Sequence, residues 1–361
     1  MTRPTMAFFG SSLVSSYWNG AATYYRGIIR GLAARGWDVT FYEPDAFDRQ
    51  AHRDMPDPDW AKVVVYPTDG DAGVHRALEA AASADVVVKA SGVGAFDELL
   101  EAAIPAMRRA GQLCFYWDVD APATLERLGA NAADPFHACI PQYDLVLTYG
   151  GGPPVVQAYT DLGARSCVPI YNAVDPDTHF PVAPDPRFLG DLALLANRLP
   201  DREARIDAFF LDAARRLPRH RFLLGGSGWA DKSLPANVAY LGHVYTRDHN
   251  AFNCSPQAVL SVNRESMART GYSPATRIFE AAGAGACLIS DHWTGIELFL
   301  EPGSEVLVAH SGDEVAAEIA ALTPGRARAI GAAARARVLA EHTYQHRVAR
   351  LEELLGVSAA R

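Results

Sequence analysis

The chain has 361 residues, of which 49% are hydrophobic and 21% are charged, and its formal net charge is −9. This length exceeds what one hydrophobic core usually serves, so two domains are expected. The negative charge argues against non-specific binding of nucleic acid, and no apolar run approaches the roughly 18 residues of a membrane span.

The cysteine pattern indicates the compartment. Five cysteines stand at positions 114, 139, 167, 254 and 287, an odd number with no C-x-x-C pair. Free thiols in a reducing cytoplasm are therefore predicted, and a disulfide framework or a zinc site is not. The N-terminal stretch MTRPTMAFFGSS lacks the longer apolar segment of a signal peptide, which also favours a cytoplasmic location.

The first part of the chain predicts a doubly wound sheet. A short apolar strand over 6–9 is followed by a glycine–serine loop, a helical pattern to about residue 35 and a second strand over 38–42. The fingerprint G-x-G-x-x-G is absent after the first strand, which argues against a conventional NAD or FAD enzyme. Tyr17, Trp18 and Asn19 either face a cleft or form a surface loop with its aromatic side chains tucked down.

Strands and helices continue to alternate. Strands are predicted over 62–66, 85–89, 112–117 and 144–148, with helices over 73–82 and 95–110. Such spacing is typical of a parallel sheet covered by helices on both faces, whose functional residues gather at the strand C-termini. Three strand ends stand out: the turn beginning with Lys89, the acids Asp118 and Asp120, and the glycine-rich loop over 149–152.

The two acids are the best general-base candidates in the first half. Asp118 and Asp120 are two residues apart, so one can face a cleft while the other caps the next helix. We take Asp120 as the candidate base. The alternative is that both acids only cap or solvate the loop before Pro122.

A proline-rich segment over 166–181 predicts the linker between two domains. The second domain then repeats the α/β pattern, with a strand over 192–196 and Arg198 and Arg202 after it. Guanidinium groups past a strand end suit a diphosphate, although both arginines can equally be surface charges at a helix start. The next strand, over 221–226, ends in glycines that allow a close backbone approach.

The segment SPATRIFEAAGAGACLISD, residues 273–291, is the most informative one. Ser273 and Pro274 predict a helix start, and the small residues after Glu280 predict close packing against a sheet. A helix start favours phosphate, Arg277 adds positive charge, and Glu280 can accept hydrogen bonds from a sugar diol. The alternative is a packed helix with an Arg277–Glu280 surface pair.

This segment, extended to SPATRIFEAAGAGACLISDHWTGIELFLEPGSEVLVA, resembles the donor site of GT-B glycosyltransferases, and most closely the CgeB-like (spore maturation protein) family. The start of the chain, GSSLVSSYWNGAATYYRGIIRGLAARGWDVTFYEPDA, and the linker pattern N-x-V-D-x-x-x-F-x-P resemble it too. The resemblance implies two Rossmann-like domains facing across a cleft. It places Glu280 on the ribose hydroxyls; a second acid often found eight residues earlier in that group is Tyr272 here.

The implied function is transfer of a sugar from a nucleotide-diphosphate sugar to an unidentified acceptor, without a metal and without a cofactor. Arg277 and the candidate base Asp120 are the expected catalytic residues. The expected donor-binding residues are Arg198, Arg202, Gly226, His243, Val244, Asn263, Arg264, Tyr272, Thr276 and Glu280. The acceptor is expected near Ser11, Ser12, Asn19 and Lys89.

The predicted domains are residues 1–170 on the acceptor side and 171–342 on the donor side, with a helix over 343–361 that crosses back to the first domain. Two other functions fit the same fold: a nucleotide-sugar epimerase, or a non-catalytic binding or structural protein. Neither a nucleic-acid partner nor an oligomeric state is indicated.

Overall fold

The computed structural model describes residues 3–356, and the chain divides into two compact units. The first domain consists of residues 3–171 together with 344–356, and the second domain is Asn172–Thr343. Residues 1–2 and 357–361, which belong to the predicted first domain and last helix, lie outside the described residues.

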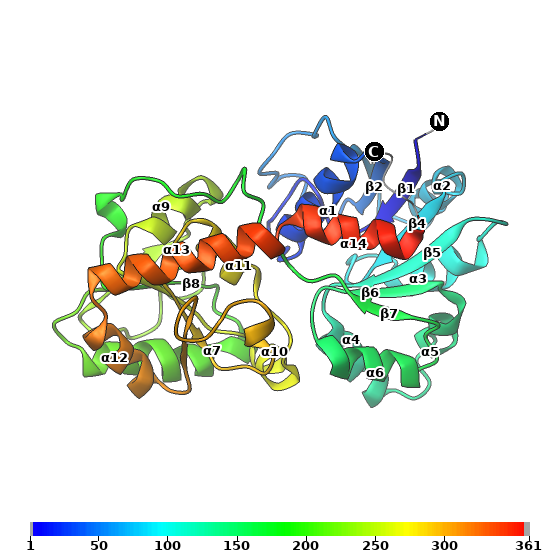
Figure 1. Cartoon of the computed structure of the whole chain (residues 1–361). Coiled ribbons are helices and arrows are strands. Elements are labelled where there is room, and N and C mark those ends of the chain that lie inside the picture. Colours follow the sequence, from blue (N-terminus) through cyan, green and yellow to red (C-terminus); the bar gives the residue numbers. More distant parts are fainter. Residues whose placement is uncertain (1–2, 357–361) are drawn as a thin grey trace. The chain divides into compact units, whose positions relative to one another are not determined.

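The first domain is built on a seven-stranded parallel sheet (Figure 1). Its strands are β1 (Thr5–Phe9), β2 (Asp38–Pro44), β3 (Lys62–Tyr66), β4 (Val86–Ala90), β5 (Leu113–Asp118), β6 (Leu145–Thr148) and β7 (Cys167–Pro169). Its helices are α1 (Ala22–Ala34), α2 (Ala72–Ala81), α3 (Asp97–Ala106), α4 (Ala121–Ala130), α5 (Phe136–Cys139), α6 (Gly152–Asp161) and α14 (Tyr344–Leu355). The order β3-β2-β1-β4-β5-β6-β7 begins as in nucleotide-binding Rossmann sheets.

Both faces of this sheet are covered, because successive side chains of a strand point to opposite faces. On one face, Phe9 stacks on Tyr42 at a centroid distance of 4.8 Å and belongs to the core that helices α2, α3, α5 and α6 complete. On the other face, Phe8 meets the ring of Tyr25 on α1 at 5.4 Å. The continuous apolar strands of the sequence reflect this two-sided burial.

The last helix, α14, packs on α1 although the second domain separates the two in sequence. Glycines on α1 make the approach close: a Cβ on Gly27 would meet the ring of Tyr344, and one on Gly31 would lie 2.8 Å from Val348 Cγ2. Nearby, Trp37 Nε1 donates to Glu352 Oε1 at 3.1 Å. Helix α14 is therefore a structural part of the first domain.

The second domain has a six-stranded parallel sheet in the order β10-β9-β8-β11-β12-β13. Its strands are β8 (Leu192–Leu195), β9 (Phe222–Gly225), β10 (Val238–Gly242), β11 (Ala258–Ser261), β12 (Leu288–Asp291) and β13 (Leu307–Ala309). Its helices are α7 (Pro200–Ile206), α8 (Asp212–Arg216), α9 (His249–Cys254), α10 (Glu265–Thr270), α11 (Thr276–Gly283), α12 (Gly312–Ala321) and α13 (Pro324–Glu341), and a π-helical turn, Asp207–Leu211, joins α7 to α8.

The two faces of this sheet again bury alternate residues of one strand. Leu192 and Leu194 lie in the larger core with helices α8 and α12, whereas Ala193 packs with Phe188 and Phe252 on the opposite face. Two parallel Rossmann-like sheets are the fold class that the sequence predicts, and the structure confirms it.

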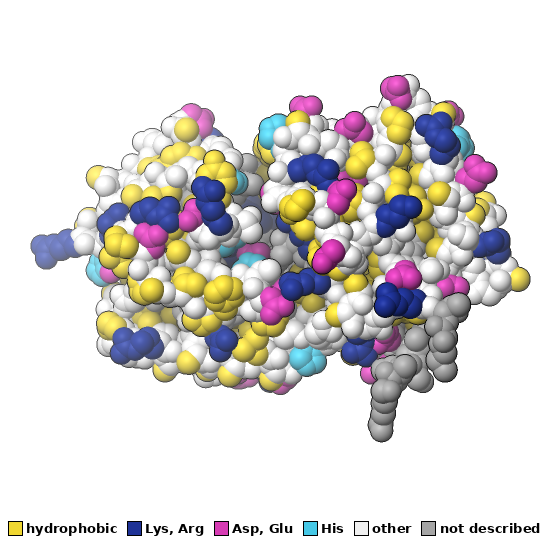
Figure 2. Space-filling model, turned by 90° about the horizontal axis from the view of Figure 1, so that it is seen from above, with side chains coloured by type: hydrophobic (Ala, Val, Ile, Leu, Met, Phe, Trp, Pro, Cys, Tyr) yellow, Lys and Arg dark blue, Asp and Glu magenta, His cyan; other side chains and the backbone are white. Residues whose placement is uncertain are grey.

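Two surface observations complete the description. None of the helices within residues 3–356 combines the length and the apolar character needed to cross a membrane. The face shown in Figure 2 intersperses basic, acidic and apolar side chains instead of gathering one kind.

Candidate functional site

Most of the predicted donor-binding residues lie at the carboxyl-terminal edge of the second sheet. They follow the ends of β8, β9, β10 and β11 and are Arg198, Gly226, His243, Val244, Asn263 and Arg264. The strand order reverses between β8 and β11. Open α/β sheets bind ligands outside the carboxyl ends of their strands at such a reversal.

Helix α11 starts later than predicted. It begins at Thr276, and Ser273 does not cap it, because the buried Ser273 hydroxyl donates to Gly271 O at 2.9 Å. Asn172 links the helix start to the beginning of the domain: its Oδ1 accepts from Thr276 Oγ1 at 3.2 Å, and its Nδ2 donates to Pro274 O at 3.2 Å. The first turn is thus fixed by a residue from the linker.

The small residues of α11 allow close packing, and one segment that they meet comes from the linker. A Cβ on Gly283 would lie 2.5 Å from Val174 Cγ2 and 3.1 Å from His179 O. Helix α11 also packs on strands β11 and β12, so the predicted packing against a sheet is confirmed. The contact with the linker comes in addition and brings His179 next to Glu280.

Glu280 lies in a buried charged cluster. Its Oε2 is 3.0 Å from Arg277 Nη1, and its Oε1 is 3.7 Å from His179 Nε2. Possible ligand atoms of His179, His249 and Glu280 all lie within 4.8 Å of one another. Burial raises the pKa of Glu280, but the neighbouring positive charge, chiefly that of Arg277, outweighs it, so that the pKa is lowered and the carboxylate is ionised at neutral pH.

His249 is neutral at neutral pH. Burial, assisted by the charge of Arg277, lowers its pKa to about 4. Sequence reasoning missed His179 and His249 as site residues, because they come from different elements and a single histidine has no periodic signal. The prediction that the protein needs no metal rested on the absence of ligand spacing in the sequence, and it stays a prediction.

Arg277 has hydrogen-bonding capacity that the protein does not use. Its Nε and Nη1 are buried, and neither has an aligned hydrogen-bond acceptor among residues 3–356. A buried cationic donor without an acceptor is costly, and charge-assisted bonds to an anion are strong. This guanidinium at the start of α11 is therefore suited to hold a phosphate group.

Asn263 and Tyr272 occupy constrained positions next to α11. Asn263 is fully buried; its Nδ2 is 3.4 Å from Ser273 O, and its Oδ1 has no hydrogen-bond partner in the described chain. Tyr272 has φ of +48°, and its N–H donates to Thr294 O at 2.6 Å. Left-handed backbone at a non-glycine residue is found mostly where the surrounding structure enforces it, often at functional sites.

The other predicted arginines are engaged with carboxylates. Arg198 contacts Glu203 at 2.8 Å and Asp231 at 2.9 Å, and Arg264 Nε donates to Asp201 at 2.6 Å. A diphosphate would have to compete with these acids. Arg202 lies in the first turn of α7. The roles of these three arginines stay predictions.

Three more predicted donor residues lie on the β9 and β10 side. His243 is exposed, whereas Val244 is buried and its carbonyl oxygen is 3.3 Å from His249 Nε2. Gly226 has φ of +116°, and a Cβ there would lie 2.1 Å from Ala196 O. Glycine is therefore required at 226 by the end of β8 itself.

The predicted acceptor-side residues form an internal network in the first domain. Ser11 Oγ donates to Asn19 Oδ1 at 2.9 Å, and Asn19 Nδ2 donates to Ser12 O at 2.8 Å. Ser12 Oγ donates to the buried Glu43 at 3.0 Å. These bonds hold the loop after β1, on which Trp18 is 68% exposed. The aromatic side chain of Trp18 is therefore not tucked down.

Lys89 is wholly buried, not at the surface of a flexible turn. Its Nζ lies 2.6 Å from Asp97 Oδ1 and 3.5 Å from Glu101 Oε1. Its amine also faces the ring of Tyr116 at 5.5 Å. In this arrangement the charge of Lys89 serves the packing of α3 on the sheet.

The two acids after β5 have different environments. Asp118 is buried and accepts from Tyr159 Oη at 2.5 Å, Ser91 Oγ at 2.7 Å and the Asp120 N–H at 2.9 Å. Burial raises the pKa of Asp118 against the lowering effect of these bonds. Asp120, at the N-cap position of α4, is partly exposed and makes no side-chain cap bond. Asp118 thus organises the loop, and the role of Asp120 as base stays a prediction.

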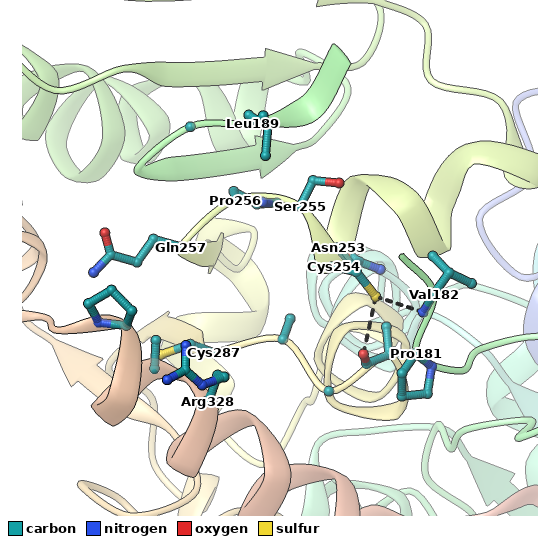
Figure 3. A pocket seen from close by; sticks show the side chains of 16 residues that line it. Pro181, Val182, Leu189, Asn253, Cys254, Ser255, Pro256, Gln257, Cys287 and Arg328 are labelled. Atoms are coloured by element: carbon teal, nitrogen blue, oxygen red, sulfur yellow. Dashed lines mark hydrogen bonds between the residues drawn. The ribbon is translucent and has the colours of Figure 1, made fainter. Parts of the chain in front are cut away.

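A cavity of about 570 Å³ lies at the opposite edge of the second sheet (Figure 3). Its lining comes from segments that precede β8, β11 and β12, including Gly190, Gln257 and Cys287. None of the predicted site residues lines it. This cavity and the charged cluster around Glu280 are therefore separate features.

Comparisons with known proteins agree with the architecture. Residues 202–353 match a family model described as "Glycosyl transferase-like". A search of curated proteins finds no match. Among solved structures, Anabaena Alr3699/HepE in complex with UDP and glucose has a TM-score of 0.69 at 14% identity, covering 99% of this chain and 100% of that one.

Two further structures show the same likeness. Sucrose-phosphate synthase (tll1590) from Thermosynechococcus elongatus has a TM-score of 0.69 at 14% identity, covering 98% of each chain. A glycosyltransferase from Rickettsia africae ESF-5 has a TM-score of 0.64 at 11% identity, covering 99% of this chain and 100% of that one. Together with the two parallel sheets, these matches show that the chain has the GT-B fold.

Proposed function

We propose that the protein is a glycosyltransferase that moves a sugar from a nucleoside-diphosphate sugar to an acceptor. The observation that carries this proposal is the pairing, on one helix turn, of Arg277 and Glu280. The Arg277 guanidinium has a buried Nε without a hydrogen-bond partner in the described chain, and the Glu280 carboxylate is buried and ionised. A diphosphate suits the first group and a ribose diol suits the second.

Two comparisons support this assignment. The match to the glycosyl transferase-like model covers α11 and therefore both residues. The Anabaena protein of the same fold has been solved with UDP and glucose and with UDP-glucose. Membership of the CgeB-like group remains part of the proposal and rests on the resemblance of the 273–309 segment.

The chemistry that we propose is electrostatic. Departure of a sugar leaves negative charge on the diphosphate, and Arg277 at the start of α11 stabilises it without a metal on the phosphates. One such donor contributes roughly 2 to 4 kcal/mol to the transition state. Asp120 is the proposed base for the acceptor hydroxyl, with the acceptor near the loop after β1.

The setting that we propose is the cytoplasm. All five cysteines carry free thiols, and four of them are buried. Free thiols persist in reducing compartments.

The test is thermal unfolding of the full chain with UDP, GDP, dTDP and ADP, each with and without Mg²⁺. A ligand at 100 times its Kd adds about 2.7 kcal/mol, or roughly 5 to 10 °C in Tm for a domain of this size. We expect one nucleotide to raise Tm equally with and without Mg²⁺. Absence of a shift with all four would contradict the proposal.

Glu280→Ala sharpens this test, because removal of the carboxylate is expected to abolish the shift while the variant stays folded. Glu318→Ala, on the surface of α12, is the matched control and should keep the shift. Incubation of the donor alone separates transfer from epimerisation: a new sugar isomer formed without an acceptor would indicate the epimerase instead.

A further inference from the structure

Three side chains with metal-binding atoms converge beneath the start of α11. His179 comes from the linker, His249 is the first residue of α9, and Glu280 lies on α11. Their possible ligand atoms lie within 4.8 Å of one another, and His179 and Glu280 are each 6% exposed. Two imidazoles and one carboxylate are a donor set that zinc-binding proteins use.

The second nitrogen of each ring is already engaged. His179 Nδ1 lies 2.9 Å from Thr178 Oγ1, and His249 Nε2 lies 3.3 Å from Val244 O. A carbonyl oxygen can only accept, so it fixes the proton of His249 on Nε2 and leaves the lone pair on Nδ1. Metal-binding histidines are almost always oriented in this way by a partner of their other ring nitrogen.

The lone pair on His249 Nδ1 accepts no hydrogen bond from the described chain. His249 Nδ1 is buried and has no hydrogen-bond partner among residues 3–356. A buried polar atom without a partner in the protein is rare and usually marks the site of a water, ion or ligand. Here that atom belongs to a cluster that already contains a carboxylate and a second imidazole.

The simpler alternative is a direct pair between His179 and Glu280. Their closest atoms are 3.7 Å apart, whereas a charge-assisted N–H···O bond is about 2.7 to 2.9 Å long. Two ligands that each lie about 2.1 Å from one tetrahedral ion are roughly 3.4 Å apart. The observed separation is nearer to the shared-ion geometry, and a direct pair would leave His249 Nδ1 unexplained.

We propose that His179 Nε2, His249 Nδ1 and Glu280 Oε1 bind one divalent transition-metal ion of the Zn²⁺ class, with a fourth position left for water or a ligand. Imidazole nitrogen selects such ions, whereas Mg²⁺ and Ca²⁺ prefer all-oxygen sites. Glu280 Oε2 faces Arg277 Nη1, so the ion occupies the other carboxylate oxygen. This site goes beyond the proposed function, and it differs from a Mg²⁺ ion bound to the phosphates.

Co²⁺ is the probe, because its visible absorption reports coordination number directly. The full-length protein is stripped with a chelator and titrated with Co²⁺ in the absence of nucleotide, and bound metal is counted by elemental analysis. We expect one tightly bound equivalent with a four- or five-coordinate spectrum, displaced by Zn²⁺ and not by Mg²⁺. No stoichiometric Co²⁺, or a six-coordinate spectrum only, overturns the proposal.

Variants assign the ligands. The variants His179→Ala, His249→Ala and Glu280→Gln should each fail to bind the one equivalent of Co²⁺ that the wild-type protein binds. The control is His292→Ala/His310→Ala, since these exposed rings stack at 4.5 Å and are the obvious adventitious metal pair in the same domain. Binding that survives the three ligand variants, or that disappears in the control, overturns the assignment.

Stability gives an independent readout. Zn²⁺ in excess should raise Tm of the stripped wild-type protein by about 5 to 10 °C and leave Glu280→Gln unchanged. If a variant does not fold, the Co²⁺ stoichiometry and the visible spectrum of the wild-type protein still show whether the metal site exists. A protein that binds a nucleotide diphosphate and no Co²⁺ refutes the metal site alone, and the converse result refutes the proposed function alone.

Discussion

The two sheets begin with the same strand order around their first strand, but predicted site residues at their carboxyl edges differ in how their polar atoms are used. In the first domain, Ser12, Asn19 and Lys89 use their polar atoms on one another or on buried acids. In the second domain, Arg277 and Asn263 keep buried polar atoms without a hydrogen-bond partner in the described chain.

Whether a buried polar group is hydrogen-bonded therefore distinguishes residues that stabilise the fold from residues that bind a ligand more clearly than residue type does. A satisfied buried network rigidifies a loop, whereas an unsatisfied group carries a free-energy cost that a ligand can remove. We therefore expect substitutions at the first edge to change stability, and substitutions at the second edge to change affinity for nucleotides.

Lys89→Met should have the largest effect, a loss of roughly 3 to 5 kcal/mol of stability, because it leaves the buried Glu101 and the half-buried Asp97 without this cation. Urea unfolding, with hydrogen exchange of β4 amides, measures it. Lys62→Met, at an exposed position on β3, is the control and should change stability by about 0.5 kcal/mol at most. A stable Lys89→Met protein that has lost turnover would place Lys89 in the acceptor site and contradict the assignment of the first edge to stability.

Arg277→Met should lower the affinity for the preferred nucleoside diphosphate about 100-fold, or about 2.7 kcal/mol, because the charge-assisted bonds to phosphate are lost. Isothermal titration calorimetry measures the effect. Arg326→Met removes a surface arginine paired with Glu318 and should leave affinity unchanged. Equal affinities of wild type and Arg277→Met would show that the unused donors of Arg277 serve another ligand.

Gly283→Ala should cost roughly 1 to 3 kcal/mol, because the added Cβ overlaps Val174 and presses on the backbone of His179. It should also weaken nucleotide binding through displacement of the neighbouring Glu280. Gly325→Ala is the matched control, since a Cβ there meets nothing within 4 Å. The free energy of unfolding and the nucleotide affinity are measured for both variants. Unchanged values for Gly283→Ala would mean that the linker segment moves to accommodate the added Cβ.

Ser12→Ala should have the smallest effect, a loss of about 1 kcal/mol, because one hydrogen bond to Glu43 disappears. Nucleotide affinity should not change. The readouts are the midpoint of urea unfolding and the Kd from calorimetry. A fall in affinity without a fall in stability would assign Ser12 to ligand binding.

The fold could be predicted because its signals are local. Apolar runs such as Val86–Ala90 and Phe222–Gly225 are buried on both sides, and their regular spacing indicates parallel strands. The predicted start of α11 is too early because Ser273 and Pro274 have the chemistry of a helix start, whereas the Ser273 hydroxyl donates to the backbone carbonyl of Gly271 and is not available for capping.

The only part of the site whose geometry could be predicted is the pair of residues that lie on one turn of α11. Arg277 and Glu280 are neighbours in sequence, so their proximity follows from helix geometry. The contacts of His179 and His249 depend on packing between three elements. The acids that neutralise Lys89 were visible in the sequence, but their pairing required the packing of α3 on β4.

The docking of α14 on α1 has a consequence for the order of events during synthesis on the ribosome. The glycine-lined groove on α1 is translated before the second domain, and the helix that fills it is translated after that domain. The first domain therefore stays incomplete, with that groove uncovered, while the whole second domain is translated. Nascent chains stalled before residue 344 should accordingly contain a protease-resistant second domain and a first domain that is still easily cut.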